Sequence, residues 1–168
     1  MNKSIFLCGF MGCGKSTIGR QIADEKLLPF IDFDEHLEIA AGSTIADTFS
    51  YFGESYFRKF ESAELLKICT DIRANRKVKV IALGGGTIIS SQNSQLVYAS
   101  GTAFFIDTDF DTCYDRIKDD PCRPLVTTRE ELEELYNKRR PIYLKHAKYT
   151  VKGVEEIYAY LQRTNIHH

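Results

Sequence analysis

Several features that would place a protein in a membrane or on nucleic acid are missing from this chain. No apolar stretch approaches the roughly 18 residues of a membrane-spanning helix, and no signal peptide precedes the first apolar run at residues 4–8. The charges nearly balance, with 22 Lys and Arg against 23 Asp and Glu and a formal net charge of -1. Such a balance gives no basic field for nucleic acid. We therefore expect a cytoplasmic protein that binds neither nucleic acid nor a membrane.

The cysteines show no disulfide pattern either. Their number is odd and no C-x-x-C pair occurs among Cys8, Cys13, Cys69, Cys113 and Cys122. Reduced thiols in a cytosolic protein are the simplest interpretation. With 168 residues, the chain is long enough for one well-buried core and too short for two ordinary domains.

A phosphate-binding motif is present near the start of the chain. Residues 9–17 fit the pattern G-x-x-x-x-G-K-[ST], between an apolar run at 4–8 and helical spacing at 17–26. A P-loop needs this context of strand, loop and helix, and the alternative is a chance glycine turn. In a P-loop, backbone N–H groups and the helix N-terminus face the phosphates, the lysine reaches the β- and γ-phosphates, and the hydroxyl ligates Mg²⁺. The candidate ATP-binding residues here are Gly12, Cys13, Gly14, Lys15, Ser16 and Thr17.

Segments typical of strands and helices alternate along the chain. Strands are predicted at residues 4–8, 28–32, 78–83 and 102–107, with a weaker fifth at 148–151. Helices are predicted after the P-loop, around 34–71, 91–99, 109–118 and 129–145, and again after Gly153. The alternation predicts an α/β fold, a parallel sheet with helices on both faces.

Two stretches interrupt this alternation. A long segment of several short helices separates the second and third predicted strands, and residues 119–124 form a polar insertion bounded by prolines. We predict that the second stretch is a mobile lid. A lid and an insertion on a P-loop sheet are typical of small-molecule kinases, which close over both substrates to exclude water. The single domain then divides into a core (1–32, 62–111 and 125–168), a substrate-binding insertion (about 33–61) and a lid (about 112–124).

Two carboxylates follow the second predicted strand, at the sheet edge where open α/β folds bind ligands. Asp32 and Asp34 are separated by one residue, so strand alternation would point them in different directions. One could hold the metal, while the other could accept a proton from an acceptor alcohol. Asp34 could equally be the N-cap of a helix over 35–41, and the two interpretations are compatible.

An arginine and a glutamate share one face of a predicted helix. Glu61 is three residues after Arg58 and could hold its guanidinium in place for bidentate recognition of a carboxylate or phosphate. From spacing alone, a solvated ion pair is the simpler interpretation. Phe49 and Phe57 nearby are ordinary candidates for the core.

Three consecutive glycines, Gly84, Gly85 and Gly86, directly follow the third predicted strand. They cost backbone entropy, so a plain loop is the weaker explanation. Because they have no side chains, a ligand could closely approach their N–H groups, which favours a binding site.

Arginines surround the predicted lid. Arg116 and Arg123 bracket it, and Arg139 and Arg140 precede Pro141 on the following helix. Lid closure would bring such cations to the charge that moves between ATP and an acceptor. For any one arginine, a solvated surface charge is the simpler alternative.

Together these motifs resemble shikimate kinase over nearly the whole chain. In order they are residues 9–17, Ile31-Asp32-Phe33-Asp34, Phe57-Arg58-Lys59-Phe60-Glu61, Leu83-Gly84-Gly85-Gly86, Arg123-Pro124-Leu125 and Lys138-Arg139-Arg140-Pro141-Ile142-Tyr143. The resemblance implies the fold of nucleoside monophosphate kinases, with a five-stranded parallel sheet, a lid and a substrate-binding subdomain. It implies Mg²⁺-dependent transfer of the γ-phosphoryl group of ATP to the 3-hydroxyl of shikimate, on the route to chorismate and the aromatic amino acids. It also implies a monomer whose partners are these two small molecules.

The resemblance further implies a role for each candidate residue. Lys15 and Arg123 would stabilise the transferred phosphoryl group, and Ser16 and Asp32 would hold one Mg²⁺ ion. Asp34 would bind the shikimate hydroxyls and is the candidate base. The shikimate carboxylate would be clamped by Arg58 and Arg139 beside Gly84, Gly85 and Gly86, in a pocket shaped and braced by Phe49, Phe57 and Glu61. Arg116 would pack on adenine.

Some alternatives stay open. Arg140 could replace Arg139 in the clamp, although the Lys-Arg-x-Pro spacing favours Arg139. A gluconate kinase would not predict three glycines together with Phe-Arg-x-x-Glu, and a nucleoside monophosphate kinase would need more phosphate-binding arginines. A GTPase-like switch would need N-K-x-D, whose aspartate residues 137–140 lack. A binding protein without catalysis should have lost one of the site residues, and none is missing.

Overall fold

The computed structural model describes residues 3–119 and 128–163 of the chain. Five parallel strands form one sheet in the order β2-β3-β1-β4-β5. The strands are β1 (Ser4–Cys8), β2 (Phe30–Asp32), β3 (Val80–Ala82), β4 (Gly101–Ile106) and β5 (Tyr149–Val151). The predicted α/β sheet is therefore confirmed, with β2 and β3 shorter than the predicted ranges 28–32 and 78–83.

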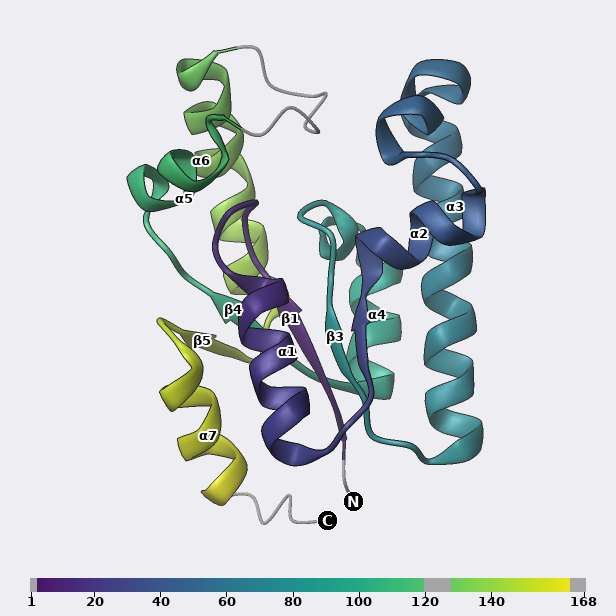
Figure 1. Cartoon of the computed structure of the whole chain (residues 1–168), viewed down its shortest axis with the longest axis vertical. Coiled ribbons are helices and arrows are strands. Elements are labelled where there is room, and N and C mark those ends of the chain that lie inside the picture. The colour runs from purple at the N-terminus through teal and green to yellow at the C-terminus, as the bar shows by residue number, and fades with distance from the viewer. Residues whose placement is uncertain (1–2, 120–127, 164–168) are drawn as a thin grey trace.

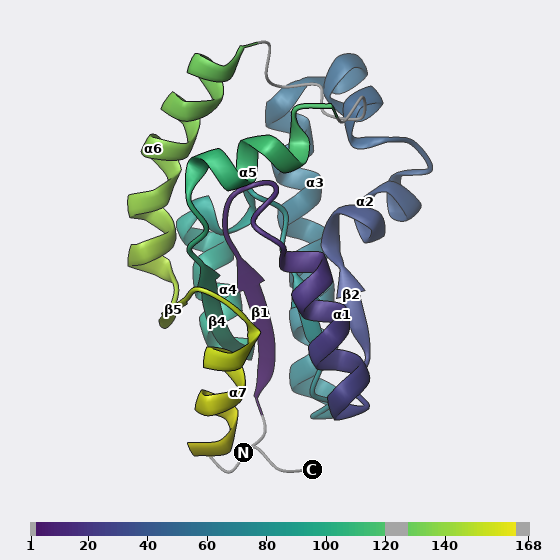
Figure 2. The ribbon, with the colours of Figure 1, turned by 60° about the vertical axis from the view of Figure 1, so that its left-hand side comes forward.

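Helices cover both faces of this sheet, as Figures 1 and 2 show. They are α1 (Lys15–Lys26), α2 (Phe33–Ala41), α3 (Ile45–Asn75), α4 (Ser91–Ser100), α5 (Phe110–Ile117), α6 (Arg129–His146) and α7 (Val154–Arg163), with a short 3₁₀ helix η1 (Thr87–Ile89). Every residue of β1, β3 and β4 is buried, as expected for strands covered on both sides. The apolar runs of the sequence are thus the central strands.

The long insertion consists of α2 and α3. At Gly53, with φ 80° and ψ 168°, the backbone leaves the helical conformation, so α3 is a short helix followed by a long one. This confirms the prediction of several helices rather than a single crossover. The long part continues to Asn75, beyond the predicted end at residue 71.

Two local predictions were wrong. The N-cap of α2 is Asp32, not Asp34: the Asp32 side chain accepts a hydrogen bond from the Glu35 backbone N–H. Because β2 ends at Asp32 and α2 begins at the next residue, strand alternation does not govern how the two carboxylates point. The helix after the P-loop begins at Lys15 rather than Thr17, directly after Gly14 in the left-handed conformation (φ 101°).

Part of the predicted lid, about 112–124, falls in α5, and residues 120–124, including Arg123, lie outside the described residues. The division into core, insertion and lid therefore stays a prediction. Within the described residues, Cys8, Cys13, Cys69 and Cys113 are buried free thiols. None of the helices in this part of the chain combines the length and apolar character needed to span a membrane.

Candidate active site

The P-loop lies at the carboxyl end of β1 and lines a cavity of about 960 Å³. The Lys15 ammonium donates to the carbonyl oxygens of Gly9 and Phe10, both at 2.9 Å, so the loop holds its own cation. The cavity is lined by Lys15 with its neighbours Gly12, Cys13, Gly14, Ser16 and Thr17. Loop N–H groups, a helix N-terminus and a lysine at one cavity are the groups that suit phosphate binding.

A pair of oxygen ligands lies beside this loop. The Ser16 hydroxyl donates to Asp32 Oδ2 at 2.5 Å, and both residues line the same cavity. Oxygen donors of this kind suit Mg²⁺, which is commonly bound by one or two protein oxygens together with substrate phosphates and water. Within residues 3–119 and 128–163, no cluster of three or more His, Cys, Asp or Glu could hold a metal without such help. The residues present therefore fit a Mg²⁺ ion that enters with a nucleotide.

The three glycines after β3, here called the glycine turn (Gly84, Gly85 and Gly86), are in close contact with two charged side chains. A Cβ atom added to Gly84 would lie 2.5 Å from Asp34 Oδ1, and one added to Gly86 would lie 2.6 Å from Arg58 Nη2. At distances under 3.0 Å, the Asp34 or Arg58 side chain would have to shift to admit a Cβ atom. Glycine at these positions therefore lets groups from α2 and α3 rest against one backbone turn.

The Arg58 guanidinium is held from several sides. Its Nη1 donates to Glu61 Oε2 at 2.9 Å, and the Glu61 side chain is only 2% exposed. The guanidinium carbon lies 5.2 Å from the ring centre of Phe57 and 5.9 Å from that of Phe49, and the two ring centres are 4.5 Å apart. A solvated ion pair, the simpler interpretation of the spacing, is thus wrong. Phe57 is both buried in the core and part of this setting.

The two adjacent arginines of α6 have different surroundings. Arg140 donates to both oxygens of Asp107, from Nε at 2.9 Å and from Nη2 at 2.8 Å, and Lys152 adds a third bond at 2.9 Å. Asp107 is 6% exposed, and the hydrogen bonds from Arg140 hold the pKa of its carboxyl below the usual value despite burial. Arg139 instead lies beside Gly85, where an added Cβ would be 3.6 Å from Arg139 Nη1. This arrangement favours Arg139 over Arg140 for the clamp.

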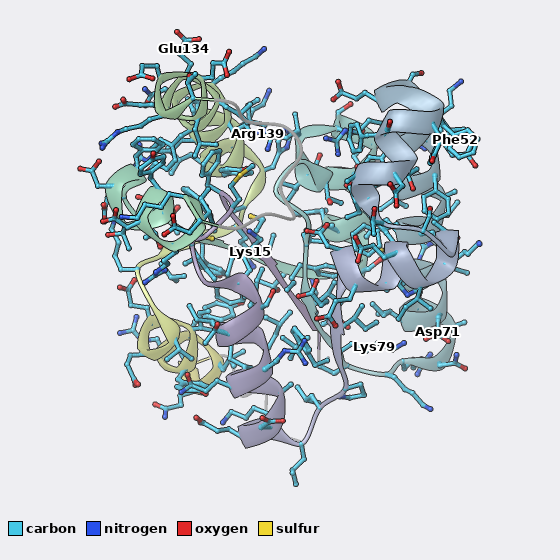
Figure 3. The ribbon with its side chains drawn as sticks, turned by 45° about the horizontal axis from the view of Figure 1, so that its top comes forward. Lys15, Phe52, Asp71, Lys79, Glu134 and Arg139 are labelled. Atoms are coloured by element: carbon cyan, nitrogen blue, oxygen red, sulfur yellow. The ribbon has the colours of Figure 1, made fainter. Side chains whose placement is uncertain are left out.

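The glycine turn separates two cavities. Gly85 and Asp34 line the larger cavity with the P-loop, whereas Gly86, Arg58 and Arg139 line a neighbouring cavity of about 410 Å³. With this end of the sheet turned forward, Lys15 and Arg139 both lie in the central region between α6 and α3 (Figure 3). The Asp34 carboxylate therefore lies on the P-loop side of the glycine turn, and the guanidinium groups of Arg58 and Arg139 line the cavity on the other side.

Arg116 belongs to the larger cavity. Its Nη1 donates to the carbonyl of Gly12 at 2.9 Å, which ties α5 to the P-loop. Thr108 makes a similar link, since its hydroxyl donates to the carbonyl of Cys13 at 3.1 Å. The segment that follows β4 therefore forms one wall of this cavity.

The sequence analysis missed two residues that shape the site. Tyr143 is buried, and its hydroxyl donates to the carbonyl of Gly85 at 2.5 Å; burial raises the pKa of this phenol well above its usual value. Asp107 follows β4 as Asp32 ends β2, so the same sheet-edge rule could have found it. No pattern in the sequence points from Tyr143 to Gly85, because only packing of α6 on the sheet brings them together.

Comparison with known proteins decides the family. The family model described as SKI: Shikimate kinase matches residues 11–164. This chain belongs to the shikimate kinase family. A shikimate kinase from Persephonella marina is 37% identical over 142 residues, covering 84% of this chain and 84% of its own. One from Thioalkalivibrio sulfidiphilus is 39% identical over 173 residues, covering 96% and 88%.

Solved structures agree with this assignment. The shikimate kinase from Acinetobacter baumannii in complex with shikimate has a TM-score of 0.86 and 30% identity, over 97% of this chain and 93% of its own. A deoxyadenosine kinase from M. mycoides shares only the fold, with a TM-score of 0.60 and 15% identity. Membership of the family makes the protein an ATP-dependent phosphotransferase, and shikimate kinases typically depend on Mg²⁺. The predicted family, fold and enzyme class are confirmed.

Proposed function

We propose that this protein transfers the γ-phosphoryl group of ATP to the 3-hydroxyl of shikimate. The observation that carries the proposal is the glycine turn, which gathers Asp34, Arg58 and Arg139 from three helices beside the P-loop. Shikimate is small, anionic and polyhydroxylated. It therefore needs cations for its carboxylate and an acceptor for a hydroxyl proton, and these three side chains supply both.

On the nucleotide side, residues 12–17 would bind the phosphates of ATP through backbone N–H groups. Lys15, now bonded to the Gly9 and Phe10 carbonyls, would turn to the β- and γ-phosphates. Ser16 and Asp32 would hold a single Mg²⁺ ion, which supplies positive charge to the phosphate oxygens when it is bound. Arg116 would pack on adenine, and Arg123, which lies outside the described residues, would meet the transferred group.

On the acceptor side, Asp34 would take the proton of the attacking hydroxyl. Its carboxylate rests against Gly84 in the cavity that also holds Lys15, so acceptor and phosphate share one space. Arg58 and Arg139 would clamp the carboxylate and so orient the hydroxyl toward the γ-phosphate. Glu61, Phe49 and Phe57 would keep Arg58 in position.

The test is Mg²⁺-dependent ADP release from ATP with shikimate, with parallel reactions on gluconate, nucleoside monophosphates and no acceptor. We expect rapid release with shikimate alone. Release with gluconate or a nucleotide instead would keep the kinase fold and refute the substrate. ATP binding without release for any acceptor would point to a binding protein.

We also propose that the enzyme works as a monomer in the cytoplasm, with only ATP and shikimate as partners. The near balance of its charges supports the absence of a nucleic-acid partner. Sedimentation velocity with and without both substrates would test the monomer, since a dimer would sediment as a clearly larger species.

A further inference from the structure

We propose that Thr87 and Asn93 are positioning residues for the reaction: with Glu61 they form a hydrogen-bonded chain that fixes the Arg58 guanidinium for the acceptor's carboxylate. The inference rests on the proposed function, because it assumes that Arg58 binds that carboxylate. It adds Thr87, which is fully buried, and Asn93, which is 1% exposed and borders the cavity of Arg58 and Arg139. Their role would be to set the geometry of the Arg58 guanidinium.

The chain runs through the protein interior behind the glycine turn. Asn93 Nδ2 donates to the Thr87 carbonyl at 2.9 Å, and the Thr87 hydroxyl donates to Glu61 Oε1 at 2.7 Å. The other oxygen of Glu61 accepts from Arg58 Nη1 at 2.9 Å. Asn93, Thr87 and Glu61 are 1%, 0% and 2% exposed, so water hardly competes for these bonds.

The Thr87 hydroxyl determines how Glu61 meets Arg58. A buried carboxylate needs a donor at each oxygen, and Thr87 occupies one of them. The second oxygen is then left for a single, directed bond to the guanidinium. Without the hydroxyl, the carboxylate could turn to pair both oxygens with Arg58, and the donors of Arg58 that face the acceptor would move.

Thr87 is itself held firmly at the glycine turn. Its backbone N–H donates to the Gly84 carbonyl at 3.1 Å, and a Cβ atom on Gly84 would lie 2.9 Å from the Thr87 hydroxyl. Asn93, on α4, anchors the Thr87 carbonyl from the other side. Thr87 thus connects the glycine turn, which contacts Asp34, with the Glu61 carboxylate, which orients Arg58.

Arg58 has a second ion-pair partner, which would compete for the guanidinium if this chain were broken. Its Nε lies 3.6 Å from Glu54 Oε1, and the Glu54 side chain is 71% exposed. Such an exposed ion pair is weak, but it would draw a loosened guanidinium away from the glycine turn. A preorganised arginine loses less freedom on binding, so the chain should improve shikimate affinity rather than the chemical step.

The experiment compares Thr87→Val, which removes the hydroxyl at nearly constant shape, with Thr87→Ser, which retains it. For Thr87→Val we expect the KM for shikimate to rise about 5- to 10-fold, with kcat and the KM for ATP within twofold of wild type. Thr87→Ser should restore the KM for shikimate. Ser94→Ala is the matched control, because it removes a buried hydroxyl that bonds only within α4. Should Thr87→Val not fold, Thr87→Ala removes the same hydroxyl together with the γ-methyl group, and so places no apolar group against Glu61.

Two further variants identify the route of the effect. If Thr87 acts through Glu61, then Thr87→Val should add little to Glu61→Gln in a double-mutant cycle. An unchanged KM for shikimate, equal rises in both KM values, failure of serine to rescue, or additive effects would each overturn the inference. Arg58→Lys shows whether the underlying clamp exists: if it leaves the KM for shikimate unchanged, the proposed function of Arg58 fails first and the inference falls with it.

Discussion

The P-loop and the proposed acceptor side of the site, which consists of Asp34, Arg58, Arg139 and the glycine turn, reach their geometry in different ways. The P-loop is a single run, residues 9–17, in which the loop backbone and the helix N-terminus are adjacent in sequence. The acceptor side takes Asp34 from α2, Arg58 from α3, the glycine turn from the end of β3 and Arg139 from α6. Binding a phosphate through backbone N–H groups is a local property, whereas recognising an acceptor needs side chains that only packing assembles.

The two regions meet at the glycine turn. Gly85 lines the cavity of the P-loop, while Gly86 lines the cavity of Arg58 and Arg139. Asp34 belongs to the P-loop cavity, so the separation concerns Arg58, Gly86 and Arg139: a substitution there should leave ATP binding nearly unchanged.

The largest effect is expected for Asp34→Asn. Loss of the proton acceptor should lower kcat by roughly 100- to 10,000-fold, while the dissociation constant for ATP stays within about twofold. Steady-state assays and calorimetric titration with ATP would measure both. Asp24→Asn, on the exposed side of α1, is the control. Near-normal turnover of the Asp34 variant would remove this residue from the acceptor role.

Gly86→Ala should weaken shikimate binding and leave ATP binding unchanged. Its new Cβ would lie 2.6 Å from Arg58 Nη2, whereas the Cβ of Gly85→Ala would make an ordinary 3.6 Å contact with Arg139 Nη1. Displacing one charge-assisted hydrogen bond corresponds to about 1.5–3 kcal/mol, or roughly a 10- to 100-fold higher KM for shikimate. Gly85→Ala should have a much smaller effect. If both alanine variants raised the KM for shikimate and the KM for ATP by the same factor, the two sides would not be separate.

Arg139→Lys should affect shikimate binding, whereas Arg140→Lys should affect the stability of the fold. Lysine at 139 keeps the charge but loses the bidentate fork, so the KM for shikimate should rise about 10-fold. Lysine at 140 should lower stability instead, since Arg140 is bound to Asp107. The KM for shikimate and the midpoint of thermal unfolding would be measured for both variants. The reverse pattern would mean that the clamp uses Arg140.

Asp107→Asn should produce the smallest effect on catalysis and a pH-dependent loss of stability. The folded pKa of Asp107 is lowered, so its contribution is present above the unfolded value of about 3.9 and is lost as pH falls through the folded pKa. We expect the variant to lose about 1–3 kcal/mol at pH 7. The difference between the thermal midpoints of the two proteins should begin to shrink as pH falls below the unfolded value and should vanish below the folded pKa. A difference that stays constant at every acidic pH where both proteins remain folded would show that charge is not the cause.

Much of this outcome was predictable from local patterns. The P-loop motif and the apolar runs of the strands depend on residues close in sequence, so their patterns predicted the parallel sheet and placed the P-loop directly after its first strand. The N-cap of α2 was assigned to the wrong aspartate, since a shift of two residues in the start of a helix leaves the pattern almost unchanged. The burial of Glu61 could not be predicted, because a glutamate three residues from an arginine looks the same in a solvated pair.

The sequence by itself determined that this chain has a P-loop, a parallel α/β sheet and the motifs of its family, because glycine spacing and apolar periodicity act over a few residues. Only the tertiary structure decided that Arg140 binds Asp107 while Arg139 lies beside the glycine turn. It also decided that Thr87 bonds to a buried Glu61, 26 residues earlier in the chain. Such contacts depend on how α3, α6 and the turn after β3 pack, and no local pattern records that packing.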